Sequence, residues 1–357
     1  MNSTALCLNQ TNGLTPLETD LEPLPTKLSK RLWISPMQFV EMTHALVMAE
    51  WALSISQRIR PTLPAPVRRG PKQVYRDSSI MVVALVQVAW WLGYEEVIDY
   101  FRAHPQAAQA AGFPAGRAIC ASQYWERRRA LGILPFWWLF VAMVWQLARM
   151  AVIQGTDLIV DATTQRVWFH ADPDAGWSYP KPGKGSVFGY KVHTMVDRWS
   201  QLPVMFLITP ANQQESTVAI TLFSLVAAIF AFSIQIVRAD AGYFTMPIWN
   251  FIRSVLHASP IIDYNLRRRG KRFLATRFFI NQWHFHLRPR AIIERHFAWA
   301  KRYFGLEAAR WRGITAAYQH TALVYSVMLG VAIVAHRCQR PELAGSRTRV
   351  LAIKTIQ

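Results

Sequence analysis

The sequence predicts an α/β fold, in which a mixed sheet flanked by helices follows an all-helical N-terminal region. Apolar residues recur at helical spacing from about residue 75 to residue 155. At Thr156 the pattern changes to short apolar or alternating segments, and helices then alternate with strands in the order βββαβαβα. Hydrophobic residues make up 52% of the 357 residues, which is enough for a large core.

Residues 1–71 are expected to be an extension that ends in a basic, proline-rich linker. One helix is predicted from Pro36 to Gln57. The segment 60–71 is expected to be extended, because its closely spaced prolines disfavour helix.

Residues 72–154 are predicted to form a helical DNA-binding or dimerisation region. Asp77 or Ser78 is expected to cap its first helix, which ends at Gly93, and Ser122 is expected to cap its third. The predicted helices cover residues 77–91, 94–103, 123–131 and 134–153. The third helix carries Arg127–Arg129, and a solvated basic face explains these residues as well as DNA contact does.

Residues 155–339 are predicted to form the α/β domain, with a basic tail at 340–357. Its predicted strands cover residues 158–161, 188–197, 202–209, 233–240 and 259–264. Its predicted helices cover residues 215–231, 245–257 with Thr245 as cap, the segment around Glu294, and 316–336. The segment Gly183–Ser186 lacks the spacing of a phosphate-binding loop and is interpreted as a turn.

The charge balance indicates a polyanionic partner. Forty Lys and Arg residues against 21 Asp and Glu residues give a net charge of +19. Such an excess favours nucleic acid or an anionic membrane surface. The densest basic loop is predicted to contact DNA through five residues: Arg267, Arg268, Arg269, Lys271 and Arg272.

Cysteine usage and hydropathy indicate the compartment. The three cysteines are isolated, so neither a disulfide framework nor a zinc site is supported, and a reducing cytosol fits. No signal peptide is recognisable at the N-terminus. The stretch Val218–Val237 has no charge and is long enough to span a bilayer, but its alternating end favours a buried helix followed by a buried strand.

Three acids follow or face the predicted strands. Asp161 ends the first strand, Asp240 follows the fourth, and Glu294 lies on a later helix. Arg290 and Lys301 project from nearly the same stripe of that helix as Glu294, a pattern that surface salt bridges alone would also explain. Converging carboxylates repel one another unless cations lie between them, which predicts a site for two Mg²⁺ ions.

These blocks of sequence resemble the bacterial insertion-sequence DDE transposases whose third acid lies in a Tyr-(2)-Arg-(3)-Glu-(6)-Lys signature. Arg290, Glu294 and Lys301 match that spacing. Four further blocks look like the family's: IVDATTQR (159–166), GYKVHTMVD (189–197), LPVMFLITPANQQES (202–216) and ADAGYF (239–244). The resemblance covers about 155–335, and more loosely the region from 72. Leu287 departs from it, because it stands at the signature tyrosine position.

The resemblance implies a ribonuclease-H-like catalytic domain. It implies Asp161, Asp240 and Glu294 as catalytic residues and metal ligands, and Arg290 and Lys301 as contacts to the DNA end. The implied cofactor is a pair of Mg²⁺ ions, which Mn²⁺ can replace. The implied partners are double-stranded DNA (terminal inverted repeats and target) and a second copy of the chain in a homodimer, with no membrane. The protein is expected in the bacterial cytoplasm, at the nucleoid.

Other acids compete for these roles. Asp197 ends the second strand and Asp263 lies in the fifth, while Asp172 and Asp174 lie in a loop and are expected to be solvated. Asp240 is preferred over Asp263 as the second acid. Trp299 is expected to pack in the core, with stacking on a base as the alternative.

The leading functional hypothesis is a transposase that cuts phosphodiester bonds at its element's terminal repeats and joins the 3′-hydroxyl ends to target DNA. The alternative is a catalytically decayed DNA-binding protein that represses transposition, which Leu287 motivates. An integral membrane protein is a third hypothesis, resting only on Val218–Val237.

Overall fold

The structure is a computed structural model of the chain. It describes residues 30–59, 75–114, 117–180, 185–263, 286–307 and 311–352. The chain divides into two compact units, residues 1–31 and residues 32–357, and the account below concerns the second. The predicted linker 60–71 and the basic loop 267–272 lie outside the described residues.

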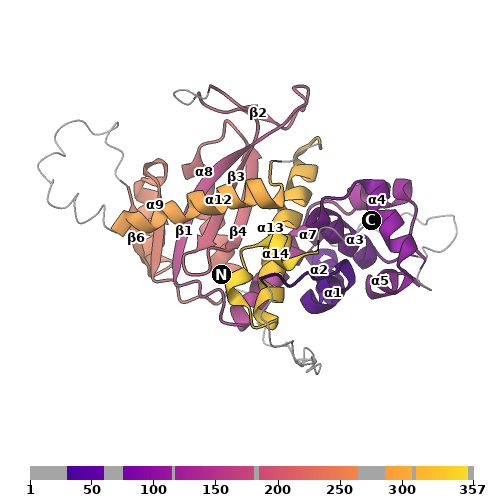
Figure 1. The fold of residues 1–357 in the computed structure, drawn as a ribbon. Helices are drawn as coiled ribbons and strands as arrows, with labels where there is room; N and C mark the ends of the chain where they lie inside the picture. Colours follow the sequence, from indigo (N-terminus) through magenta and orange to yellow (C-terminus); the bar gives the residue numbers. More distant parts are fainter. Residues whose placement is uncertain are drawn as a thin grey trace, which may run out of the picture. The chain divides into compact units, whose positions relative to one another are not determined.

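A six-stranded mixed sheet forms the centre of the α/β part (Figure 1). Its strands are β1 (Asp157–Arg166), β2 (Gly176–Trp177), β3 (Phe188–Asp197), β4 (Pro203–Pro210), β5 (Ile236–Ala239) and β6 (Ser259–Ile262). The order is β2-β3-β1-β5-β6, and β4 also pairs with β3. β1, β3 and β4 are antiparallel neighbours, whereas β1, β5 and β6 run parallel. The predicted mixed α/β fold is therefore confirmed.

Four helices of the α/β part follow or cover the sheet: α8 (Glu215–Ile229), α9 (Met246–Ser254), α12 (Ala291–Phe304) and α13 (Ile314–Arg337). Figure 1 shows α12 lying across the strands. Ile293 and Phe297 of α12 form an apolar cluster with Ile159 of β1 and Val196 of β3. Since side chains alternate between the faces of a strand, α12 covers the face that also bears Asp161.

The N-terminal region is helical, as predicted. Its helices are α1 (Pro36–Thr43), α2 (Ala45–Ile59), α3 (Asp77–Trp90), α4 (Tyr94–Ala103), α5 (Pro105–Ala110), α6 (Ala121–Ala130) and α7 (Leu134–Arg149). α13 packs against α3 and α7 on one side and against β4 on the other. One continuous hydrophobic core therefore joins the N-terminal helices to the sheet. Short elements complete the chain: η2 (Ala241–Tyr243), η4 (Arg288–Arg290), η5 (Pro341–Leu343) and α14 (Arg347–Val350).

Some helices of the protein are apolar enough to resemble membrane spans. Within the described residues, α13 is long and apolar enough to cross a membrane, and the bent pairs α3–α4 and α6–α7 would also qualify if each counted as one span. Yet 89% of the apolar window of α13 is buried inside the protein. The stretch Val218–Val237 divides into α8 and β5, as predicted, and one face of α8 is buried through Val218, Ala219, Leu222, Phe223 and Val226.

Several helix boundaries differ from the prediction for local reasons. The helix expected over 36–57 is broken at His44, whose backbone is left-handed (φ 50°). Neither Asp77 nor Ser78 caps α3, because the N-cap is Arg76 and makes no side-chain cap bond. Ser122 was wrong as a cap too, since α6 already begins at Ala121.

Candidate active site

Asp161 and Asp240 lie side by side on neighbouring strands. β1 and β5 pair in parallel up to Val160 and Ala239, and the two acids are the next residues along each strand. Adjacent strands lie about 4.8 Å apart, so the two carboxylates share one edge of the β1–β5 pairing. The prediction that Asp161 ends its strand was wrong, because β1 continues to Arg166 alongside β3. Asp161 instead marks the point where the pairing with β5 stops.

The electrostatic surroundings leave Asp161 short of positive charge. Burial raises its pKa to about 6, and the charge of Asp240 adds to this effect, while the Ala162 amide and Arg290 oppose it. The Ala162 amide donates to the Asp161 side chain at 2.8 Å, and the Ala241 amide donates to Asp240 at 2.6 Å. Two adjacent carboxylates of this kind favour a bound cation, because a cation stabilises the ionised form of both.

Arg290 connects Asp161 to the third predicted acid. One guanidinium nitrogen lies 3.8 Å from Asp161 Oδ2 and the other 3.7 Å from Glu294 Oε1. Glu294 is the more solvent-exposed acid, at 65% of its side chain. Across the part of the chain that the structure describes, no three Asp, Glu, His or Cys side chains are grouped closely enough to hold a metal ion. The structure thus brings Asp161 and Asp240 together and links Glu294 to them through a guanidinium.

Lys301, the last residue of the expected signature, lies beside β1 beyond Asp161. Its ammonium group is 3.3 Å from the Thr164 carbonyl oxygen and forms an ion pair with Glu307. Trp299 packs against Phe304 and the backbone of Gly345, in agreement with the expected core position. Leu287, at the signature tyrosine position, is buried. Arg290, the N-cap of α12, and Lys301 therefore both lie beside β1, near Asp161 and Thr164 respectively.

A fourth acid, Glu215, was missed by the sequence analysis. It is the first residue of α8, and its carboxylate pairs with Lys191 Nζ of β3 at 2.7 Å. Lys191 Nζ also donates to the Gln213 carbonyl oxygen at 2.7 Å. Burial alone would raise the pKa of Glu215, but the bond from Lys191 lowers it. No local pattern identifies Glu215, because its partner Lys191 lies 24 residues upstream and is recognised only in the folded chain.

Glu215 and Tyr243 extend the polar cluster around the two aspartates. A Cβ placed on Gly242 would lie 3.8 Å from Glu215 Oε2, so this carboxylate reaches the turn that follows Asp240. Burial and the charges of Asp161, Glu215 and Asp240 raise the pKa of Tyr243. The Tyr243 hydroxyl is buried and has no hydrogen-bond partner within the described residues. An orphaned hydroxyl beside three carboxylates fits a site that receives a hydrated divalent cation, which prefers oxygen ligands.

The competing acids have structural partners. Asp197 accepts from the Gly155 amide at 2.9 Å and from the Ser200 hydroxyl at 2.8 Å, which fixes the β3–β4 turn. The expectation that Asp172 is solvated was wrong, because it is buried and accepts from the Tyr190 hydroxyl and the Gly313 amide. Asp263 follows Ile262, whose partner in β5 is Ala239, so it lies next to Asp240 in the same row.

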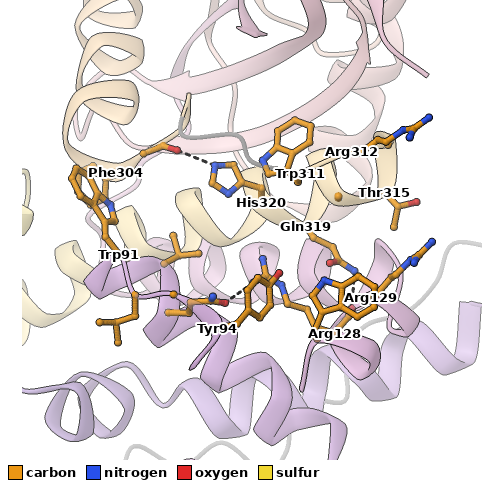
Figure 2. Close-up of a pocket in the computed structure, with 18 of the residues that line it drawn as sticks. Trp91, Tyr94, Arg128, Arg129, Phe304, Trp311, Arg312, Thr315, Gln319 and His320 are labelled. Atoms are coloured by element: carbon orange, nitrogen blue, oxygen red, sulfur yellow. Dashed lines mark hydrogen bonds between the residues drawn. The ribbon is translucent and has the colours of Figure 1, made fainter. Parts of the chain in front are cut away.

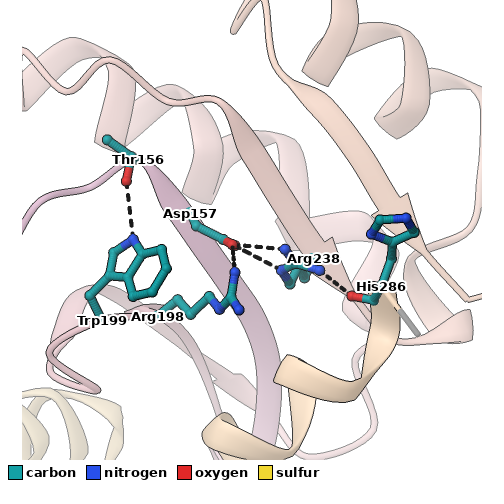
Figure 3. A network of polar contacts seen from close by, with 6 residues as sticks. All are labelled: Thr156, Asp157, Arg198, Trp199, Arg238 and His286. Carbon is teal, nitrogen blue, oxygen red and sulfur yellow. Dashed lines mark hydrogen bonds and ion pairs between the residues drawn. The ribbon is translucent and has the colours of Figure 1, made fainter. Parts of the chain in front are cut away.

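A buried ion-pair network supports the sheet below these acids (Figure 3). Asp157 accepts from Arg238 Nε and Nη2, each at 2.8 Å, and from Arg198 Nη1 at 2.8 Å. Arg238 also donates to the His286 carbonyl oxygen, just ahead of η4 and α12. The same guanidinium thus holds β1, β5 and the start of the α12 segment together, which positions Arg290 and Glu294 over the sheet.

The part of the chain that carries this site is similar to a known protein family. Residues 154–329 match the family model described as the transposase DDE domain. The matched range begins just before β1 and ends within α13, and it includes all four acids described above. No curated protein matches the chain. The mixed sheet with its flanking helices agrees with the ribonuclease-H-like fold of such domains.

Proposed function

Because residues 154–329 match the family model described as the transposase DDE domain, we propose that the protein is the transposase of a bacterial insertion sequence. It cuts phosphodiester bonds at the element's terminal inverted repeats and joins the 3′-hydroxyl ends to target DNA. The observation that carries this proposal is the adjacency of Asp161 and Asp240 on parallel strands, with Arg290 reaching both Asp161 and Glu294. The protein acts as a homodimer in the bacterial cytoplasm, because two element ends are cut together.

Asp161, Asp240 and Glu294 are the residues that would hold divalent cations. Asp161 and Asp240 offer oxygen ligands from two adjacent strands, and Glu294 reaches them once Arg290 moves onto a phosphate. Bound Mg²⁺, or Mn²⁺ in its place, supplies Lewis-acid stabilisation of the attacking and departing oxygens. The orphaned Tyr243 hydroxyl supports this assignment, because it can bond to water at such a centre.

Arg290, the N-cap of α12, and Lys301 of α12 position the DNA strand. The planar guanidinium of Arg290 can bind two oxygens of one phosphate, whereas Lys301 offers a point charge farther along the helix. Both groups already lie beside β1, with Lys301 anchored at Thr164. A phosphate that replaces Asp161 as the partner of Arg290 leaves the carboxylate free for a metal ion. DNA binding and metal binding are therefore expected to support each other.

Glu215 is proposed as a positioning residue rather than a ligand. Its negative charge acts on Asp161 across the turn that follows Asp240. Lys191 holds the Glu215 carboxylate in place. Removing the negative charge alone leaves a buried ammonium beside the site, which weakens attraction for a divalent cation. Removing the positive charge of Lys191 instead strengthens the attraction for a divalent cation.

The net charge of +19 and the basic loop 267–272 are proposed to supply affinity that does not depend on sequence. Each phosphate that the protein neutralises releases counterions. The logarithm of the binding constant should therefore fall with the logarithm of salt concentration, with a slope of about −0.9 per phosphate.

The test is Mg²⁺-dependent cleavage of a supercoiled plasmid that carries the ends of the element. Asp161→Asn, Asp240→Asn and Glu294→Gln should each abolish cleavage while DNA binding is retained. Asp99→Asn is the matched control, because Asp99 is exposed and pairs only with its helix neighbour Arg102 among the contacts described. Retained cleavage in any of the three variants would contradict the assignment.

A second candidate is a DNA-binding protein without catalysis that represses transposition. The buried Leu287 favours it, because no phenolic group is present at that position to contact a phosphate. Folded wild-type protein that binds the element's ends but nicks no plasmid in Mg²⁺ or Mn²⁺ would establish this candidate instead.

A further inference from the structure

A pocket of about 1280 Å³ lies apart from the four acids, between the N-terminal helices and the start of α13 (Figure 2). It exceeds the roughly 300–1,000 Å³ of typical small-ligand sites, so it has room for more than one small group. Aromatic rings and guanidinium groups dominate its lining: Trp91, Tyr94, Trp125, Arg128, Arg129 and Arg312.

Three aromatic rings of this pocket are exposed, although large rings are usually buried. The exposed fractions are 56% for Trp91, 39% for Tyr94 and 46% for Trp125. The Arg129 guanidinium lies 5.5 Å from the Trp125 ring, and Arg128 lies 5.7 Å from the Tyr94 ring. Such pairs offer flat faces for stacking together with positive charge.

The walls of the pocket are held by bonds that cross between distant segments. Arg128 donates to Gln87 Oε1 at 2.6 Å, and Gln319 of α13 donates to the Arg128 carbonyl oxygen at 3.0 Å. Arg312 donates to the Ala171 carbonyl oxygen at 2.6 Å. The positions of Arg128 and Arg312 are therefore set before any ligand arrives.

The polar groups of the lining favour an anionic ligand. Asp174 is the acid among the lining residues, and its carboxylate accepts from the Ile314 amide at 3.0 Å. Trp311, which also lines the pocket, has a buried indole N–H without a hydrogen-bond partner among the described residues. Positive charge, flat rings and an unmet donor together match a nucleotide, whose base stacks and whose phosphate and base edge accept hydrogen bonds.

The pocket also lies at the C-terminal end of α12, the helix that carries Glu294. Phe304 and Gly305, at the end of α12, line it, and Glu294 is ten residues earlier on the same helix. Ten residues of α-helix span about 15 Å, with Lys301 in between.

We propose that this pocket binds unpaired nucleotides of the DNA strand whose phosphodiester bond is held beside Glu294. This inference rests on the proposed function, since it takes DNA as the substrate. Unpaired bases are required, because bases inside a duplex present no free face to Trp125 or Tyr94. The pocket thus recognises a DNA end whose strands have separated.

The test compares two DNA probes in the absence of divalent cations. One is a blunt 20-base-pair duplex, and the other carries a six-nucleotide single-stranded extension with 2-aminopurine. Trp125→Ala and Arg129→Ala should each weaken binding of the extended probe about tenfold and leave the blunt duplex unchanged. Trp125→Phe should retain most of the affinity. Trp199→Ala is the matched control, because Trp199 is 55% exposed and stacks with Arg198 but lies outside the pocket.

The outcomes separate this inference from the proposed function. If wild-type protein binds both probes and neither pocket variant differs from it, the pocket assignment is wrong and the proposed function stands. An equal loss for both probes would overturn nucleotide stacking in favour of a contact to duplex phosphate. Wild-type protein that binds neither probe would overturn both proposals.

Discussion

Asp157 and Asp161 lie four residues apart on one face of β1, yet their surroundings differ. Asp157 is buried and bonded to two guanidinium groups at 2.8 Å. Asp161 has an acidic neighbour in Asp240 and only a longer ion pair, at 3.8 Å, with Arg290. Where the chain supplies the cations, the acid stabilises the fold. Where it does not, we propose that the acid binds a cation from solution.

Asp157 and Asp161 should respond differently to substitution, and DNA cleavage should show the difference most strongly. Asp161→Asn should reduce plasmid cleavage to background, because the adjacent pair of oxygen ligands is lost. The same change should not lower the thermal midpoint, since it removes a buried charge next to Asp240. Cleavage and differential scanning calorimetry on one preparation measure both. A variant that unfolds, or one that still cleaves, would contradict the difference between the two acids.

Asp157→Asn should show the reverse pattern. It leaves the buried Arg238 without its carboxylate, and breaking such a pair costs about 3–5 kcal/mol. Urea unfolding should report this loss of stability, with residual cleavage per folded molecule within a few-fold of wild type at low temperature. An unchanged unfolding midpoint would mean that the network is not what stabilises β1 and β5.

The Lys191–Glu215 pair provides a third case, in which a carboxylate with its own cation lies beside the site. Substituting each partner in turn tests the effect of charge on the site. Glu215→Gln should raise the Mg²⁺ concentration needed for half-maximal cleavage about tenfold, as outer-shell changes commonly do. Lys191→Met should leave it unchanged or lower it. A purely structural role would move both variants in the same direction, so equal shifts would reject the electrostatic account.

His320 of α13 should make the stability of the protein depend on pH. Burial lowers the pKa of His320 to about 4, with Arg128 adding to this and the bond to the Gly305 carbonyl opposing it. The unfolded chain takes up a proton near pH 6.5 and the folded chain does not. Stability should therefore fall as pH drops from 6.5 towards 4, by at most about 2 kcal/mol at pH 5 for this group. His320→Gln should flatten that dependence in thermal unfolding, and an unchanged slope would contradict it.

Local pattern was enough to predict much of the fold. The strand Phe188–Asp197 and the helix Tyr94–Ala103 were predicted at the observed bounds, because alternation and helical spacing are unambiguous there. β1 was predicted too short, since its second half (ATTQR) is polar and owes its strand conformation to pairing with β3. Such pairing is a tertiary effect that a local pattern does not contain.

The site was predictable where an acid follows an apolar strand. Asp161 and Asp240 have that pattern, and the spacing of Arg290, Glu294 and Lys301 is a helix stripe. Glu215 and Tyr243 were not predictable, because their places beside the aspartates depend on how α8 and η2 meet the sheet. The pocket lining was not predictable either, since it combines α3, α6 and α13 from distant parts of the chain.

Mn²⁺ binding, measured by isothermal titration calorimetry on the full chain, tests directly whether Asp161 and Asp240 together hold a divalent cation. Asp161→Asn and Asp240→Asn should each weaken binding at least tenfold. Asp174→Asn should bind as wild type does, because Asp174 lies in the loop before β2 and accepts from the Ile314 amide at the start of α13. Equal Mn²⁺ affinity in wild type and both site variants would contradict the claim.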